Sequence, residues 1–232
     1  MRLLDIGRQM VLEAPTADVF AHIRLSDVAR RAGVTTGALY HYWDSQDDYQ
    51  VELLGQILSP DPYSLREPVA ERVRAAAAGG VTLHQLIQAV CADNVDRFFG
   101  SSDFRLQVAL WVSADDVVRA RLAAQYAAVG AEWVEFYRTV FEVYGFTLRK
   151  PFTYDWLATA LTALLEGLIL RAEVDPHSIG VDGSDAAPTS EWGLFSSTVL
   201  ALLPGVTQEV GAEPVDLWSW APDRRATGAD GD

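Results

Sequence analysis

The chain has 232 residues, half of them hydrophobic, which is enough for one large domain or two small ones with a sizeable core. A single cysteine excludes an internal disulfide and a cysteine-based zinc site, and no apolar run reaches the roughly 18 residues that a transmembrane helix needs. The formal charge of −14 and the pI near 4.6 indicate an acidic surface that resists stray contact with nucleic acid.

Residues 2–13 predict a first helix, because apolar positions recur there at helical spacing. Charged and amide residues interrupt this stretch, which excludes a secretion signal, so we expect a cytoplasmic protein. Residues 14–23 predict a loop or short turn before the next helix.

Residues 24–43, RLSDVARRAGVTTGALYHYW, have the pattern of two short helices joined by a tight turn. Apolar residues keep helical spacing up to Ala32, and Gly33 suits the position just after a helix. The Thr35 hydroxyl can cap the second helix by accepting a hydrogen bond from a backbone N–H. Such a pair is a helix-turn-helix, whose second helix enters the major groove and meets base edges with its first residues.

Two large side chains of the second helix, Leu39 and Trp43, are expected to face inward. Four residues then face outward: Thr36, Gly37, Tyr40 and His41. Thr36 can contact base edges, and Gly37 lets the helix backbone approach the DNA closely. The Tyr40 and Tyr42 hydroxyls can reach phosphate oxygens, although packing alone would also explain these two rings.

Residues 32–46, AGVTTGALYHYWDSQ, resemble the DNA-binding motif of the TetR (tetracycline repressor) family of bacterial regulators. The family pattern runs Ala-Gly-Val, Ser or Thr, Gly-x-Leu-Tyr-x-Tyr/His-Phe and then Ser-Lys. The resemblance implies that positions 36, 37, 38 and 41 face bases and that positions 40 and 42 face phosphates. The DNA-binding residues that we expect are Arg24, Thr35, Thr36, Gly37, Ala38, Tyr40, His41 and Tyr42.

Three positions depart from the family pattern. Arg24 stands where the family usually has Thr; it cannot cap a helix but can reach a phosphate, and Ser26 is the alternative cap. Trp43 replaces Phe, a change that the core must absorb. Gln46 replaces Lys, so one phosphate contact loses its charge.

The negative charge is unevenly distributed along the chain. Residues 1–58 hold five arginines and eight carboxylates, a net charge of −3, which leaves −11 for the remainder. Residues 22–43 hold three arginines and one aspartate, a net charge of +2. The motif is therefore locally basic, but its DNA affinity should depend less than usual on counterion release.

Residues 45–58 predict another helix, which Ser45 can cap. The stretch SPDPYS, residues 59–64, breaks the chain, so we expect a DNA-binding domain at 1–58, a helical domain at 62–221 and a disordered tail at 222–232. No segment shows strong strand alternation, and the predicted fold class is all-α. Further helices are predicted at 65–78, 82–99, 102–112, 115–144, 152–174 and 190–205, with a polar loop at 174–189.

The helix at 152–173 and the last helix are apolar on most sides, which indicates burial on most sides. The TetR resemblance implies a four-helix bundle formed by two subunits, and an ordinary intrachain core is the alternative. The dimer-interface residues that we expect are Leu157, Leu161, Leu164, Leu168, Phe195, Val199 and Leu202.

Two amides, Asn94 and Gln125, interrupt otherwise apolar stripes in a region rich in aromatic residues. An apolar site with a few polar groups is typical of a small-molecule pocket, and the resemblance implies one in the helical domain. Amides paired inside a packed core are the alternative interpretation. The effector-binding residues that we expect are Asn94, Phe98, Trp111, Gln125, Trp133 and Tyr137.

Other chemistry finds little support in the sequence. The acids and His177 of the loop after residue 172 lack the spacing of a metal site, and Cys91 lies on an apolar stripe as an inert core thiol. No enzyme motif is present, and we expect no cofactor. The sequence therefore predicts a ligand-responsive repressor that binds a pseudo-palindromic operator as a homodimer and is released by a small apolar or aromatic effector. The alternative is a helical dimeric interaction protein whose helix-turn-helix head no longer binds DNA specifically.

Overall fold

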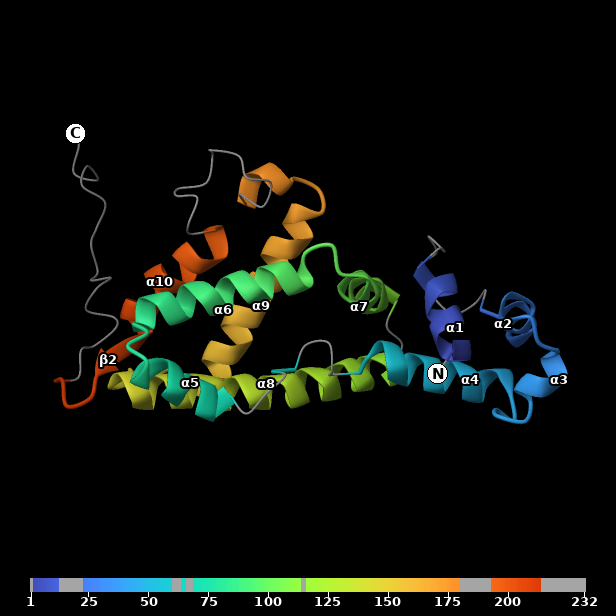
Figure 1. The fold of residues 1–232 in the computed structure, drawn as a ribbon, viewed down its shortest axis with the longest axis horizontal. Coiled ribbons are helices and arrows are strands. Elements are labelled where there is room, and N and C mark those ends of the chain that lie inside the picture. The colour runs from blue at the N-terminus through green and yellow to red at the C-terminus, as the bar shows by residue number, and fades with distance from the viewer. Residues whose placement is uncertain are drawn as a thin grey trace, which may run out of the picture. The chain divides into compact units, whose positions relative to one another are not determined.

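The computed structural model describes residues 2–12, 23–59, 64–65, 69–113, 116–179 and 193–213 (Figure 1). Within this part of the chain the fold is all-α, as predicted, with ten α-helices, one short 3-10 helix and one small sheet. The helices are α1 (Arg2–Leu12), α2 (Leu25–Ala32), α3 (Thr36–Leu39), α4 (Gln46–Ile57), α5 (Val69–Ala78), α6 (Leu83–Phe98), α7 (Ser102–Ser113), α8 (Asp116–Tyr144), α9 (Tyr154–Ala172) and α10 (Leu194–Val206). Residues 14–22 of the loop predicted at 14–23, most of the loop at 174–189 and the predicted tail lie outside the described residues.

Two short strands, β1 (Phe146–Leu148) and β2 (Thr207–Glu209), form an antiparallel sheet that the sequence did not predict. Each strand has three residues, too few to show the alternation that identifies a strand. The 3-10 helix η1 (Pro176–Ile179) likewise falls where we expected only a polar loop. None of the described helices is long and apolar enough to cross a bilayer.

The chain divides into two compact units that do not follow the boundary expected at residues 59–64. Unit 1 comprises Met1–Arg66 and Phe98–Gly130, and unit 2 comprises Glu67–Arg97 and Ala131–Asp232. The predicted DNA-binding head, residues 1–58, therefore shares a compact unit with α7 and the first half of α8.

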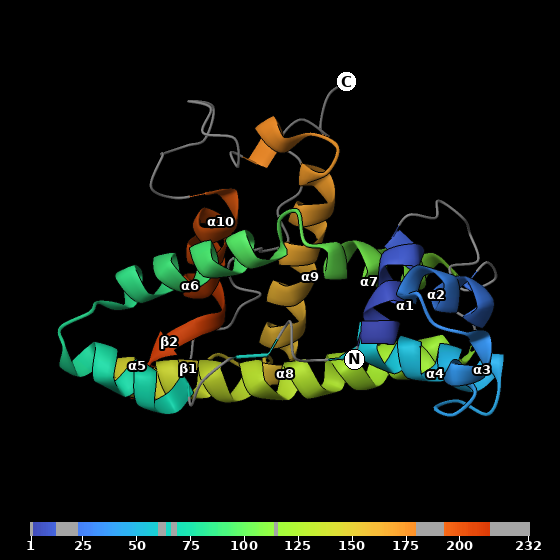
Figure 2. The ribbon, with the colours of Figure 1, turned by 45° about the vertical axis from the view of Figure 1, so that its right-hand side comes forward.

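Unit 1 is built around one apolar cluster that joins the head to α7 and α8. Residues of α1, α2, α3 and α4 contribute most of it, and Figures 1 and 2 show these helices gathered with α7. Leu106 and Leu110 add side chains from α7, while Val118 and Leu122 add them from α8. All four are almost completely buried, so the head completes its core with residues from far along the chain.

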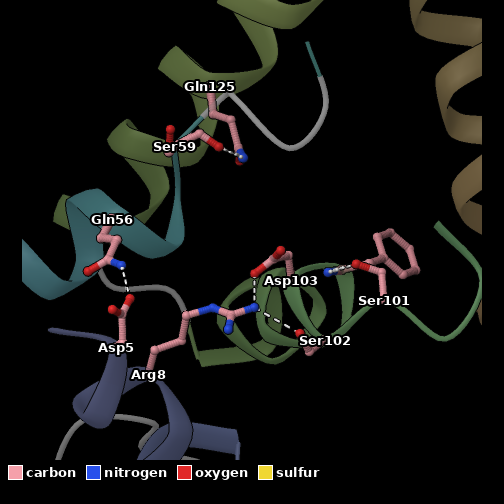
Figure 3. A network of polar contacts seen from close by, with 9 residues as sticks. Asp5, Arg8, Gln56, Ser59, Ser101, Ser102, Asp103 and Gln125 are labelled. Atoms are coloured by element: carbon pink, nitrogen blue, oxygen red, sulfur yellow. Dashed lines mark hydrogen bonds and ion pairs between the residues drawn. The ribbon is translucent and has the colours of Figure 1, made fainter. Parts of the chain in front are cut away.

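Polar contacts hold the same elements of unit 1 together (Figure 3). Arg8 of α1 donates to the Ser102 hydroxyl at 2.8 Å and forms an ion pair with Asp103, both at the start of α7. Gln56 of α4 donates to the Asp5 carboxylate at 2.9 Å. Together with the apolar cluster, these contacts fix α1 to both α4 and α7.

Unit 2 contains α9, α10, the small sheet and the second half of α8. Apolar residues recur at helical spacing along the whole of α8 and are buried in both halves, Val118, Leu122 and Val129 in unit 1 and Phe136 and Val140 in unit 2. α9 begins at a Thr153 cap, whose hydroxyl accepts from the Trp156 N–H at 3.1 Å, and its buried face packs against α10.

The tight packing of α1 on α4 yields a prediction for Gly7. A methyl group at this position would overlap the hydroxyl of Tyr49, a fully buried ring that donates to the Leu3 carbonyl at 3.2 Å. We expect Gly7→Ala to lower the free energy of unfolding by about 1–3 kcal/mol in urea denaturation. Tyr49→Phe removes the overlapping oxygen and should recover part of that loss.

Gly130→Ala is the matched control, because a methyl there meets no atom of the described residues within 4 Å apart from its own helix. It lies inside α8, so the better helix propensity of alanine should raise stability by up to about 1 kcal/mol. Equal effects of the two substitutions would contradict the described packing of α1 on α4.

Candidate functional site

The second helix of the predicted motif is short and capped. α2 ends at Gly33, whose φ of 70° is readily adopted only by glycine, and the Thr35 hydroxyl accepts from the Ala38 N–H at 3.3 Å. The α-helix spans four residues and ends at Leu39, before the Trp43 that we expected it to include. Leu39 is its one buried residue, so tertiary packing rather than helix length holds α3 in place.

The predicted DNA-binding residues form an accessible surface. Arg24, Thr35, Gly37 and His41 are exposed, and Thr36 and Ala38 are half-buried. The side chains of Tyr40 and Tyr42 are 51% and 73% exposed, too open for packing to be their main role. Val34, in the turn between α2 and α3, is also exposed.

A hollow of about 350 Å³ lies where the start of α2 meets α3, and it brings together residues that the sequence separates. Arg24, Ser26, Thr36 and Tyr40 line it. The Arg24 side chain has no partner among the described residues, whereas Arg30 is paired with Asp27 at 2.6 Å. The hollow thus combines a free guanidinium with two hydroxyls and a phenol, groups that suit a phosphate oxygen.

Gln46 explains two of the departures from the family pattern. Arg24 is the N-cap residue of α2 but gives no side-chain cap, and Ser26 does not replace it. The Gln46 Oε1 instead accepts from the Leu25 N–H at 2.8 Å, and its Nε2 donates to the Ile23 carbonyl at 2.5 Å. The side chain therefore closes the start of α2 from the start of α4 rather than merely losing a charge.

The core accommodates Trp43 in place of phenylalanine because the indole N–H has a hydrogen-bond partner there. Its ring meets the Tyr49 ring edge-on, with centroids 4.9 Å apart, and its Nε1 donates to a Glu52 carboxylate oxygen at 2.6 Å. A buried indole usually needs such a partner, which phenylalanine would not. Ser45 caps α4 as predicted, accepting from the Asp48 N–H at 3.1 Å.

The six expected effector residues fall into two groups, one in each unit. In unit 1, Phe98 and Trp111 belong to a chain of ring contacts, Phe98–Phe104–Trp111–Tyr126, with centroids 5.8 to 6.4 Å apart. Gln125 donates to the Ser59 carbonyl at 3.2 Å, but its buried Oε1 has no partner among the described residues.

Gln107 belongs with this first group, although sequence reasoning missed it. It is 3% exposed, donates to the Tyr126 hydroxyl at 3.0 Å and leaves its Oε1 unpaired within the described chain. The signal was available, because Gln107 interrupts an apolar helix just as Gln125 does.

In unit 2, Trp133 and Tyr137 have ring centroids 5.7 Å apart, and Asn94 donates to the Val90 carbonyl one turn earlier at 2.7 Å. Burial raises the pKa of the Tyr137 hydroxyl far above its usual range, and the nearby Cys91 adds to the shift. Burial also raises the pKa of Cys91 to about 11, against a smaller opposing effect of its hydrogen bond with Ser196. At neutral pH Cys91 is thus a protonated, unreactive thiol.

Most of the expected dimer-interface residues are already covered within one chain. Leu157, Leu161, Phe195 and Val199 are at most 8% exposed, while Leu164, Leu168 and Leu202 are half-buried. The open face of α9 consists of other residues: Trp156, Thr159, Ala163, Gly167 and Leu170. Within the described residues no group of histidine, cysteine and acidic side chains could hold a metal, and Asp182 and Asp185 lie outside them.

Residues 20–48 match the model of the bacterial regulatory proteins of the tetR family. The chain is 27% identical over 183 residues to the HTH-type transcriptional regulator BetI 1 of Chromohalobacter salexigens, covering 76% of this chain and 84% of that protein. Its fold is similar to that of reduced NemR from E. coli, with a TM-score of 0.55, 18% identity and coverage of 91% of this chain and 98% of NemR.

Two further solved structures share the fold. A putative transcriptional regulator from Saccharomonospora viridis, crystallised in complex with choline, has a TM-score of 0.54 at 14% identity, covering 90% of this chain and 97% of the other. NalD of Pseudomonas aeruginosa, the secondary repressor of the MexAB-OprM multidrug efflux pump, has a TM-score of 0.52 at 21% identity, covering 90% and 96%. BetI 1 and NalD are regulators rather than enzymes, in keeping with the absence of an enzyme motif from this sequence.

The Gln46 contacts predict a coupling between two positions that are distant in sequence. Gln46→Ala removes the acceptor of the Leu25 N–H and leaves the Ile23 carbonyl with only a long contact from the Gln50 Nε2 at 3.5 Å, which should lower the free energy of unfolding by about 1–3 kcal/mol. Gln46→Lys should cost nearly as much, because lysine cannot accept from the Leu25 N–H.

Restoring the family's threonine tests this coupling. Arg24→Thr supplies a helix cap, a device that typically contributes about 0.5–2 kcal/mol. It should stabilise the Gln46→Lys chain more than it stabilises the parent chain, whose α2 is already closed. The test is urea unfolding of the parent chain, the two single variants Arg24→Thr and Gln46→Lys, and the double variant. Additive changes in the free energy of unfolding would show that Gln46 does not act at the start of α2.

Proposed function

We propose that this chain is a TetR-type, ligand-responsive regulator that binds a pseudo-palindromic operator as a homodimer. The match of residues 20–48 to the tetR family model and the similarity to the regulator BetI 1 support this proposal. The observation that carries the proposal is the exposed surface of α3 with the adjoining hollow. A capped helix presents Thr36 and His41 beside two open tyrosines and an unpaired Arg24. This is the arrangement that a half-site reader requires.

Repression with release by an effector is the outcome that we propose. The first group of effector residues lies in unit 1, so a ligand on the Trp111 and Tyr126 rings would act on the same compact body as α3. The unpaired Oε1 atoms of Gln107 and Gln125 would accept from a donor group on that ligand. An effector with different affinity for two positions of the head shifts their populations, and with them DNA affinity.

The effector that we propose is small and apolar or aromatic. The choline complex of the Saccharomonospora viridis protein makes a quaternary ammonium compound a useful second probe. Its positive charge could rest on the faces of Trp133 and Tyr137 in unit 2. Thermal shifts with aromatic compounds and with choline therefore test the two groups of residues separately.

Base contacts and phosphate contacts should respond differently to substitution. Thr36→Ala and His41→Ala should each cost about 1–3 kcal/mol on the preferred operator and lower the ratio of specific to random binding. Tyr40→Phe and Tyr42→Phe should weaken binding to all sequences alike. Arg24→Ala should do the same and flatten the log–log salt dependence by about one unit per subunit. Quantitative binding to a selected operator and to random DNA at several salt concentrations measures the affinity, the ratio of specific to random binding and the salt dependence of each variant.

Ala127→Leu, at an exposed position of α8 outside the motif, is the control and should leave DNA binding unchanged. If the Thr36 and His41 variants keep the full ratio of specific to random binding, α3 does not read bases. If no sequence is preferred at all, the alternative holds, in which the head serves protein interaction.

The open face of α9 is the surface that we propose for the dimer. Its centre consists of small residues, Ala163 and Gly167, which allow two helices to approach closely, and Trp156 and Leu170 flank them. The buried leucines would support this face from within the chain instead of making the main contacts. A substitution that tests the dimer should therefore avoid them.

Gly167→Leu separates dimerisation from folding. A Cβ at this position meets no atom of the described residues within 4 Å apart from its own helix, and leucine favours the helix, so the protomer should be as stable as the parent or more so. The added bulk should block close approach of a second α9 and give a monomer in sedimentation velocity. A monomeric parent would refute the dimer, and a dimeric Gly167→Leu protein would refute this face.

A further inference from the structure

A cavity of about 420 Å³ lies within unit 2, beside the small sheet. Figure 2 shows this sheet at the end of α8. The start of α6, the ends of α8 and α10, and both strands bound it. None of the six expected effector residues lines it. Its volume falls within the range of about 300–1,000 Å³ that is typical of small-molecule sites.

The walls of this cavity are mostly apolar. They are formed by Leu83, Ile87, Phe141, Phe146, Leu200 and Leu203. Residues from several elements thus surround one space, and a hydrocarbon chain or ring would leave water on entering it.

Arg149 provides a fixed positive charge in this wall. Its backbone N–H donates to the Val206 carbonyl at 2.9 Å, and its Nε donates to the Thr207 carbonyl at 2.5 Å. Thr207 is itself held, because its hydroxyl donates to the Leu203 carbonyl at 2.8 Å. The half-buried guanidinium is therefore anchored on one edge, and its terminal nitrogens have no partner among the described residues.

An anchored guanidinium with a free edge matches the two oxygens of a carboxylate. Among the described residues, Glu209 is the only carboxylate that lines the cavity, and it makes no ion pair with Arg149. Glu209 is opposite Phe146 in the sheet, two residues beyond the Thr207 that holds Arg149. A second negative charge on a ligand would meet Glu209, so the site favours one carboxylate over a dianion such as a phosphate monoester.

We propose that this cavity binds an apolar monocarboxylate, with the carboxylate on Arg149 and the apolar body among the six wall residues. The site goes beyond the effector region of the proposed function. Binding here can be measured without DNA, so failure of this proposal and failure of the regulator proposal are distinguishable.

The test is isothermal titration of the full chain with decanoate and 2-naphthoate, which offer a linear and a ring-shaped body on the same headgroup. Both should bind, and decanol and decyl phosphate should bind at least about tenfold more weakly than decanoate. Arg149→Gln should weaken decanoate binding by about ten- to a hundredfold and leave decanol unaffected. Arg149→Lys keeps the positive charge but loses the paired N–H donors of the guanidinium. Its affinity for decanoate should therefore lie between that of the parent chain and that of Arg149→Gln.

Arg138→Gln is the matched control, because Arg138 lies in the same unit, outside the cavity and beside the Tyr154 ring. It should bind decanoate like the parent. Equal binding of decanoate and decanol to the parent, or full decanoate binding by Arg149→Gln, would overturn the proposal. So would the absence of decanoate binding at millimolar concentration.

A measurement on the parent chain keeps the proposal testable even if Arg149→Gln fails to fold. Nuclear Overhauser contacts from the decanoate methylenes should reach the methyl groups of Ile87, Leu200 and Leu203. Contacts to the rings of Trp111 or Trp133 in their place would assign the carboxylate to the effector region and reject this cavity.

Discussion

The orientation of α3 depends on one apolar cluster that the head shares with α7 and the first half of α8. A four-residue helix with one buried side chain, Leu39, cannot hold its own direction, so the surrounding core must hold it. That core is incomplete without Leu106 and Leu110 of α7, and the contact of Arg8 with Asp103 ties α1 to the same helix. A displacement of α7 must therefore either carry the head with it or expose buried apolar surface. Close packing makes the first outcome less costly.

The departures from the family pattern are compensated by nearby residues. In each case a polar side chain supplies a hydrogen-bond partner that would otherwise be missing. Arg24 leaves the start of α2 without a side-chain cap, and Gln46 supplies the missing acceptor from a neighbouring helix. Trp43 brings an indole N–H into the core, and Glu52 accepts from it. Gln46 and Glu52 both belong to α4, so this helix supports the motif by hydrogen bonds as well as by its apolar face. The loss of the family lysine and the loss of the family threonine are thus one structural change rather than two.

Local signals predicted the helices well, because caps and 3.6-residue periodicity act over short distances. Thr35, Ser45 and Gly33 marked helix ends correctly, and the stripe from Val118 to Val140 marked the buried face of α8. Features that depend on distant partners were not predictable in the same way. The sheet joins residues 146–148 to residues 207–209, and neither stretch carries a strand pattern of its own. Leu157 and Leu161 had the correct periodicity for burial, but periodicity cannot say whether the covering surface belongs to the same chain or to another.

The acidic composition is compatible with the helix-turn-helix motif because the groups that the motif exposes are mostly uncharged, so its proposed contacts with DNA depend little on net charge. Of the arginines in residues 22–43, Arg30 is paired with Asp27, while Arg24 remains open beside the Tyr40 phenol. The groups around α3 are mainly hydroxyls, phenols and backbone N–H donors, which bond phosphates and bases at short range and contribute little at long range. Negative charge elsewhere then disfavours nonspecific adhesion to DNA without opposing a docked complex, since salt screens it beyond about 10 Å. In the function that we propose, the head gains its DNA affinity from fit, and fit requires the rigid core that α7 and α8 complete.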